Sequence, residues 1–226
     1  MKLDDKDLEI VRTRYAARLR EYGVTPGALG WDKGKQEIRF DVLTSQYDCK
    51  GKSFLDIGCG FGDLIGTLEK KSSSFTYYGV DLVPELIEVA RVLHPEGHVR
   101  FDVMDFLAGP VSGEFDYAIA SGIFNFKLVQ GDNYEFVRSA MEKALGLCRD
   151  GLAFDFLSDK VDYRYEHTFH YSPERLLGMA YSFSRNVVLR NDYMPFEFSV
   201  FIFKDGTFSK EDTLFTRYKE LQGKPR

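Results

Sequence analysis

Residues 54–64 of the chain read FLDIGCGFGDL, an apolar run that ends in an acid and is followed by three alternating glycines. A glycine lets a ligand approach the backbone without a Cβ in the way, and it also tolerates tight turns. In an open parallel sheet, ligands bind beyond the carboxyl ends of the strands. The stretch therefore predicts a strand and a ligand-binding loop, with a simple tight turn as the alternative.

Strand-like and helix-like segments alternate along the chain after this point. The predicted strands cover residues 53–57, 75–81, 98–105, 114–120 and 151–157, and the predicted helices between them cover residues 62–70, 84–93 and 133–148. This alternation is typical of βαβ units, which form a parallel sheet with helices on both faces.

The end of the chain breaks this pattern. Residues 172–183 are predicted to form a helix that begins at Ser172 and Pro173, a favoured pair for an N-cap and a first helical residue. Residues 186–192 and 196–204 are predicted to form two strands, and their short link suits an antiparallel pair. We therefore expect an open α/β sheet with one antiparallel strand near its edge.

The beginning of the chain has the spacing of helices. A Gly/Pro-rich break separates one helical pattern over residues 3–17 from another over residues 35–47. We expect residues 1–48 to form a helical extension or lid, and residues 49–226 to form one compact domain.

Composition excludes several classes of protein. The chain has 226 residues and a formal net charge of −5, without a basic tract, so nucleic acid is not expected as a partner. We expect neither a membrane span nor a secretory signal, because apolar runs of the required length are missing. The three scattered cysteines show neither metal spacing nor a disulfide framework, which favours a cytoplasmic protein without a metal.

Two further acids follow predicted strands. Asp81 closes the second strand, about 20 residues beyond the loop, where a carboxylate meets a ribose diol in nucleotide sites. Asp105 follows the third strand between Met104 and Phe106, so it is a candidate for an adenine amino group. The alternatives are a helix cap for Asp81 and a solvated loop acid for Asp105.

The residue after the third glycine narrows the choice of nucleotide. A dinucleotide fingerprint has the spacing G-x-G-x-x-G, but Asp63 stands where the pyrophosphate would bind. This disfavours a nicotinamide dehydrogenase. It favours an adenosine without phosphate that carries an amino acid, whose ammonium group Asp56 would meet.

These residues together resemble the class I S-adenosylmethionine-dependent methyltransferases, over about residues 50–205. The resemblance implies a seven-stranded sheet of order 3-2-1-4-5-7-6 with strand 7 antiparallel. It also implies that Asp81 binds the ribose, that Asp105 binds the adenine, and that Ser121 and Gly122 lie under the sulfonium. The residues implied for the methionine part are Asp56, Gly58, Cys59, Gly60 and Gly62.

The resemblance does not name a substrate. The segments ALGWDKGKQEIRF and SGIFNFK are similar to one subgroup of these enzymes, but they identify no methyl acceptor. The Asn-Pro-Pro-Tyr motif of nucleic-acid and glutamine methyltransferases is absent, because SGIFNFK occupies its place. Methylation of a base or an amide nitrogen is therefore disfavoured.

The N-terminal segment contributes further cofactor candidates. Arg39 is a candidate for the methionine carboxylate through a forked ion pair, and Gln36 lies near it. Trp31 and Leu82 are also expected on the cofactor, and Tyr15 on the substrate. The alternative is that this segment merely docks, with Arg39 on a solvated face.

The richest stretch for catalysis is DKVDYRYEHTFHYSPE, residues 159–174, which follows the fifth strand. A histidine titrates near neutral pH, so His167 or His170 is a candidate base. We assign His170, Tyr171 and Asn125 as catalytic candidates, and Tyr163 and His167 as substrate candidates. Loop packing and helix capping are the alternatives for each.

The sequence thus predicts a monomeric or homodimeric enzyme that methylates an oxygen or nitrogen of a small molecule with S-adenosylmethionine. Two other readings stay open. In one, the sulfonium is attacked within the same molecule, which releases methylthioadenosine. In the other, the cofactor is bound without catalysis.

Overall fold

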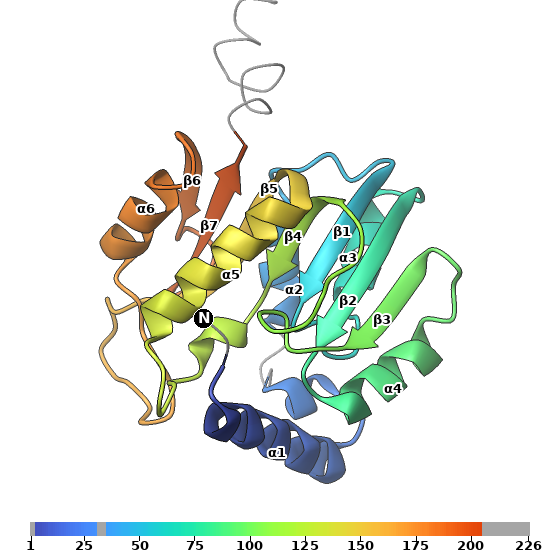
Figure 1. Ribbon diagram of the computed structural model, residues 1–226, viewed down its shortest axis with the longest axis horizontal. Coiled ribbons are helices and arrows are strands. Elements are labelled where there is room, and N and C mark those ends of the chain that lie inside the picture. The colour runs from blue at the N-terminus through green and yellow to red at the C-terminus, as the bar shows by residue number, and fades with distance from the viewer. Residues whose placement is uncertain (1–2, 31–34, 205–226) are drawn as a thin grey trace, which may run out of the picture.

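Seven strands form one open sheet of order β3-β2-β1-β4-β5-β7-β6 in the computed structural model, which describes residues 3–30 and 35–204 (Figure 1). All neighbours are parallel except β7, which runs antiparallel to both β5 and β6. The expected order and the antiparallel strand are confirmed. The strands are β1 (Lys52–Ile57), β2 (Phe75–Asp81), β3 (Val99–Val103), β4 (Phe115–Ala120), β5 (Cys148–Leu157), β6 (Asn186–Arg190) and β7 (Glu197–Phe203).

Helices cover both faces of the sheet. Alternate side chains of β1 point to opposite faces, so Leu55 packs with α5 and α6, whereas Phe54 packs with α2, α3 and α4. The helices are α1 (Asp5–Tyr22), α2 (Gln36–Leu43), α3 (Leu64–Lys71), α4 (Pro84–Leu93), α5 (Asn133–Leu147) and α6 (Pro173–Tyr181), with short 3₁₀ turns η1 (Pro26–Leu29) and η2 (Ile123–Asn125). None of the helices in the described ranges is both long and apolar enough to cross a membrane.

Side-chain caps set where two of the helices begin. Ser172 accepts a hydrogen bond from Arg175 N with Pro173 at the first helical position of α6, as the sequence predicts. Asp132 does the same for α5 through Tyr134 N and Glu135 N. Each cap satisfies donors that have no partner within the helix.

Helix α1 lies across the end of the sheet to which the parallel strands point (Figure 1). Two polar contacts attach it there. The buried carboxylate of Asp7 accepts hydrogen bonds from Val129 N (2.7 Å) and Gln130 N (3.2 Å). Arg12 Nε donates to Leu82 O (3.0 Å), directly after β2. A helix whose own pattern is weakly apolar is therefore held by long-range hydrogen bonds.

Gly62 in the loop after β1 has a packing role. Its φ is +83°, a region that side chains disfavour, and a Cβ there would lie 2.8 Å from the ring of Phe101 and 3.0 Å from His94. The third glycine thus allows the loop to pack against β3 and α4.

We expect Gly62→Ala to lower the free energy of unfolding by about 1–3 kcal/mol, because it adds both backbone strain and a clash. Urea denaturation measures the change. Gly66→Ala is the matched control, since its Cβ meets nothing within 4 Å in α3, and it should raise stability by about 0.5–1 kcal/mol. Equal effects of the two substitutions would contradict the packing role.

Candidate functional site

A cavity of about 380 Å³ lies at the carboxyl ends of the strands. Its walls come from the glycine loop, the segments after β2, β3 and β4, the loop of residues 165–168, and helices α1 and α2. This size is typical of sites for small molecules. The predicted site residues that line it are Tyr15, Gln36, Arg39, Asp56, Gly58, Cys59, Gly60, Asp81, Leu82, Met104, Asp105, Phe106, Ser121, Asn125 and His167.

Asp81 joins the glycine loop to the start of α4. Its Oδ2 accepts from Gly60 N (3.0 Å), and its Oδ1 accepts from Val83 N (3.0 Å). Burial raises the pKa of Asp81, while the backbone donors of Val83 and Gly60 oppose that rise. A carboxylate oxygen has several acceptor directions, so capping and ligand binding are compatible here.

Asp56 is buried directly under the glycine loop. Its Oδ2 accepts a hydrogen bond of 2.6 Å from the hydroxyl of Tyr77. Burial raises the pKa of Asp56 to about 7, the Tyr77 hydrogen bond opposes this, and the charges of Asp81 and Asp63 add to the rise. The group is a buried acid that a nearby cation would ionise.

Asp105 has an oxygen that suits a ligand donor. Its Oδ1 accepts from Leu107 N (2.9 Å), but its Oδ2 is buried without a hydrogen-bond partner among the described residues. Met104 and Phe106 line the cavity on either side of it. A buried acceptor without a donor is costly, so this oxygen fits an amino group between two apolar side chains.

Ser121 is held by a hydrogen bond to an acid that the sequence analysis did not identify. Asp155 on β5 is buried and accepts from Ser121 Oγ (2.5 Å) and Gly122 N (2.7 Å). Burial raises the pKa of Asp155, while the charge of Arg39 lowers it. The available signal was an acid inside the apolar run GLAFDFL, which is unusual for a central strand.

Arg39 lines the cavity, but its guanidinium has a protein partner that the sequence did not suggest. It forms a buried, two-pronged ion pair with Glu197 at the start of β7. Gln36 donates to Asp63 Oδ2 (3.0 Å). The predicted contact of Arg39 with a methionine carboxylate stays a prediction. The Arg39–Glu197 ion pair connects α2 to the antiparallel strand β7.

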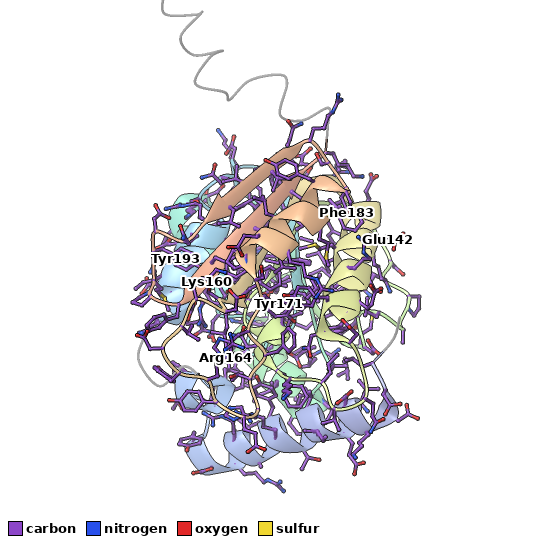
Figure 2. The ribbon with its side chains drawn as sticks, turned by 90° about the vertical axis from the view of Figure 1, so that its left-hand side faces the viewer. Glu142, Lys160, Arg164, Tyr171, Phe183 and Tyr193 are labelled. Atoms are coloured by element: carbon purple, nitrogen blue, oxygen red, sulfur yellow. The ribbon has the colours of Figure 1, made fainter. Side chains whose placement is uncertain are left out.

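The structure corrects two of the catalytic candidates. Tyr171 is buried in the core, where its hydroxyl donates to Phe124 O (3.1 Å), and it does not line the cavity. Figure 2 shows Tyr171 inside the molecule, whereas Arg164 lies on the loop that approaches α1. His170 also lies outside the cavity wall, because Ser158 O (2.8 Å) and Thr168 Oγ1 (3.1 Å) hold its two ring nitrogens. Neither is placed to touch a reacting atom.

Two other predicted residues, Tyr163 and Gly62, do not contribute to the described cavity wall. Tyr163 is exposed and packs edge-on against Tyr165 and Phe196 outside the wall, so the substrate contact expected of it stays a prediction. Gly62 faces Phe101 rather than the cavity. Trp31 lies outside the described residues.

The loop that carries His167 is positioned by backbone pairing. Lys127 N donates to His167 O (3.0 Å), and Phe169 N donates to Asn125 O (2.9 Å). These bonds place His167 beside Asn125 in the cavity wall. Burial lowers the pKa of His167, and the charge of Arg14 lowers it further. Wall residues that sequence reasoning missed include Arg14, Leu29, Ile123, Phe126, Tyr165 and Thr168.

Comparisons with known proteins agree with this geometry. Residues 54–145 match the family model described as a methyltransferase domain. Rv1506c of Mycobacterium tuberculosis, whose own methyltransferase designation is provisional, is 30% identical over 158 residues, which is 67% of this chain and 93% of that protein. The chain therefore belongs to the class I S-adenosylmethionine-dependent methyltransferases, and S-adenosylmethionine is its methyl donor.

Other similarities are shorter or more distant. The ubiquinone biosynthesis O-methyltransferase of Xanthomonas oryzae is 34% identical over 83 residues, so the match spans only 34% of that enzyme and 35% of this chain. Magnesium protoporphyrin IX methyltransferase from Synechocystis, solved with SAH, covers 88% of this chain and 100% of its own at a TM-score of 0.65 and 16% identity. The N-methyltransferase NodS from Bradyrhizobium japonicum covers 84% of this chain and 98% of its own, with a TM-score of 0.62 and 15% identity. These two structures share the fold.

We expect the unfolding free energy of the ligand-free protein to fall as the pH rises from about 4 to about 7, because over this range the unfolded state releases the Asp56 proton while the folded state keeps it. A carboxyl pKa raised from 3.8 to about 7 contributes stability that is fully present below about 3.8 and is lost progressively as the pH rises to about 7, by at most about 4 kcal/mol.

Asp56→Asn keeps an acceptor for Tyr77 and removes the ionisation. Its melting temperature should exceed that of the wild type at pH 8, and the gap should narrow as the pH falls from about 7 to about 4. A gap that does not change with pH would contradict the raised pKa.

Proposed function

We propose that the protein transfers the methyl group of S-adenosylmethionine to an oxygen or nitrogen of a small-molecule acceptor. The observation that carries the proposal is one cavity with two chemically different ends. Asp56, Asp81 and Asp105 line one end, and Asn125, Tyr165 and His167 line the other. The first end suits a cofactor with an ammonium group and hydroxyl donors, and the second suits an acceptor.

The acidic end fits the cofactor group by group. Asp81 would receive the ribose hydroxyls, and the buried Oδ2 of Asp105 would receive the adenine amino group between Met104 and Phe106. Asp56 would meet the methionine ammonium, directly or through water, and Gly58 and Gly60 would let the methionine part lie against the backbone. Cys59 and Leu82 would complete the apolar contacts.

Ser121 would lie under the sulfonium. Its hydroxyl donates to Asp155, which leaves the oxygen lone pairs of Ser121 free to face a positive charge. The buried carboxylate of Asp155 behind Ser121 would also create a negative potential at the position proposed for the sulfonium. Methyl transfer is an in-line displacement from a good leaving group, so alignment of the nucleophile can supply several kcal/mol of the barrier reduction.

His167 is the base that the geometry favours. It lies in the cavity wall beside Asn125, and its lowered pKa keeps the imidazole neutral at pH 7. A neutral imidazole can take the proton that an attacking hydroxyl or ammonium group must lose. Asn125 would orient the same nucleophile.

Residues 1–48 would act as a helical lid over the compact domain of residues 49–226. Tyr15 and Leu29 reach the cavity from this segment, and Asp7 and Arg12 attach it to loops on the sheet. A lid that closes over both ligands excludes water from the reacting atoms.

The expected effect of Asp81→Ala is a weakening of S-adenosylmethionine and S-adenosylhomocysteine binding by at least about tenfold in calorimetry, because hydrogen bonds to a charged group are lost. Asp102→Asn is the control, since that acid pairs with Tyr78 and Arg100 outside the cavity. No binding to the wild type at millimolar ligand would refute the function. If the enzyme releases methylthioadenosine when incubated with S-adenosylmethionine and no acceptor, the reaction is a cyclisation or lyase reaction and not methyl transfer.

His167→Gln should lower kcat by about 10²–10⁴-fold and leave the Kd for S-adenosylhomocysteine within about twofold, because the base acts on the acceptor. In the wild type, kcat/KM should rise with pH through a pKa below 6.5 and then level off, and the variant should lack this rise. His98→Gln, an exposed residue outside the cavity, serves as the control. An unchanged kcat in His167→Gln would rule out this role.

A further inference from the structure

Helix α1 brings a guanidinium to the wall of the cavity. Arg14 lines the cavity together with Tyr15 and Val11 of the same helix. It is only half-buried, so solvent still reaches it, and its position depends on the attachment of α1 to the sheet. No acid in the described ranges forms an ion pair with Arg14.

The charges of the cavity wall are arranged unevenly. Its described acids are Asp56 near the end of β1, Asp81 at the end of β2 and Asp105 just after β3, where the proposed cofactor would lie. Its two described arginines are Arg14 and Arg39, and Arg39 is already engaged by Glu197. Arg14 is therefore the cation that the wall offers to a ligand.

The neighbours of Arg14 place this charge beside the proposed base. Its charge acts on the imidazole of His167, which follows β5 in sequence, and on the hydroxyl of Tyr15. Asn125, on the same side, has a buried Oδ1 without a hydrogen-bond donor among the described residues. A ligand at this end meets a cation, a base and an unused acceptor.

We propose that Arg14 recognises a carboxylate or similar anionic group on the methyl acceptor, whose hydroxyl or amine donates to Asn125 and faces His167. The inference rests on the proposed function and specifies its acceptor as an anionic small molecule. A guanidinium matches a carboxylate with two parallel hydrogen bonds, and a partly buried site strengthens that contact. Phe126, Leu128 and Tyr165 supply apolar contacts for the rest of such a molecule.

Arg14 could bind the methionine carboxylate of the cofactor instead of a carboxylate of the acceptor. The following experiment distinguishes these two alternatives. Three matched acceptor pairs differ only in carboxylate against carboxamide: 4-hydroxybenzoate and its amide, 4-aminobenzoate and its amide, and 4-hydroxyphenylacetate and its amide. Release of S-adenosylhomocysteine measures turnover, and calorimetry measures binding of S-adenosylhomocysteine by itself. The proteins are the wild type, Arg14→Gln, Arg14→Lys and the control Arg20→Gln, which removes a charge from the exposed side of α1.

We expect turnover of at least one acid, with kcat/KM about 10- to 100-fold above that of its amide. Arg14→Gln should abolish this preference and keep the Kd for S-adenosylhomocysteine within about twofold. Arg14→Lys should retain part of the preference, because it keeps the charge but loses the two parallel hydrogen-bond donors of the guanidinium. Arg20→Gln should resemble the wild type.

Equal turnover of acids and amides, or turnover of none of the acids, would overturn the inference. A tenfold loss of S-adenosylhomocysteine binding in Arg14→Gln would also overturn it, because Arg14 would then serve the cofactor carboxylate. Failure of the wild type to bind S-adenosylhomocysteine at all is a different result, and it refutes the proposed function itself.

Discussion

The carboxylate of Asp81 holds together the loops on which the site depends. It accepts one hydrogen bond from Gly60 in the glycine loop and another from Val83 at the start of α4. Because β1 and β2 are parallel neighbours, their carboxyl ends already lie at one edge of the sheet, and Asp81 makes that adjacency a fixed geometry. Helix α1 is attached at the same place, since Arg12 donates to Leu82.

Charge then divides the cavity into two regions. The strand ends carry Asp56, Asp81 and Asp105, whereas α1 and the loop after β5 bring Arg14 and His167. With the cofactor and the acceptor placed as we propose, negative charge beside the sulfonium cofactor and positive charge beside its acceptor would orient the two molecules in opposite senses. The fold produces this separation because the acids lie at the ends of strands, whereas Arg14 lies on α1, which packs over them.

Residues directly after strands were the easiest to predict, because the strand order alone places them. Asp56, Asp81, Asp105 and Ser121 line the cavity for that reason. The stretch after β5 was harder, since it is long and folds back on itself. Residue 171 returns to pair with Ser158 and enters the core, so Tyr171 and His170 are structural although they share a loop with His167.

The sequence by itself determined the alternation of strands and helices and the acids at the strand ends, because periodicity and spacing are local properties that the chain carries in every conformation. The strand order and S-adenosylmethionine followed from the family resemblance that these motifs carry. Only the tertiary structure decided the partners of long-range charges: Arg39 with Glu197, 158 positions later, and Asp7 with the backbone beyond Leu128. Such pairs depend on how helices pack over the sheet, and no spacing along the chain encodes that. For the same reason Arg14 became a candidate for acceptor binding only once α1 lay across the cavity.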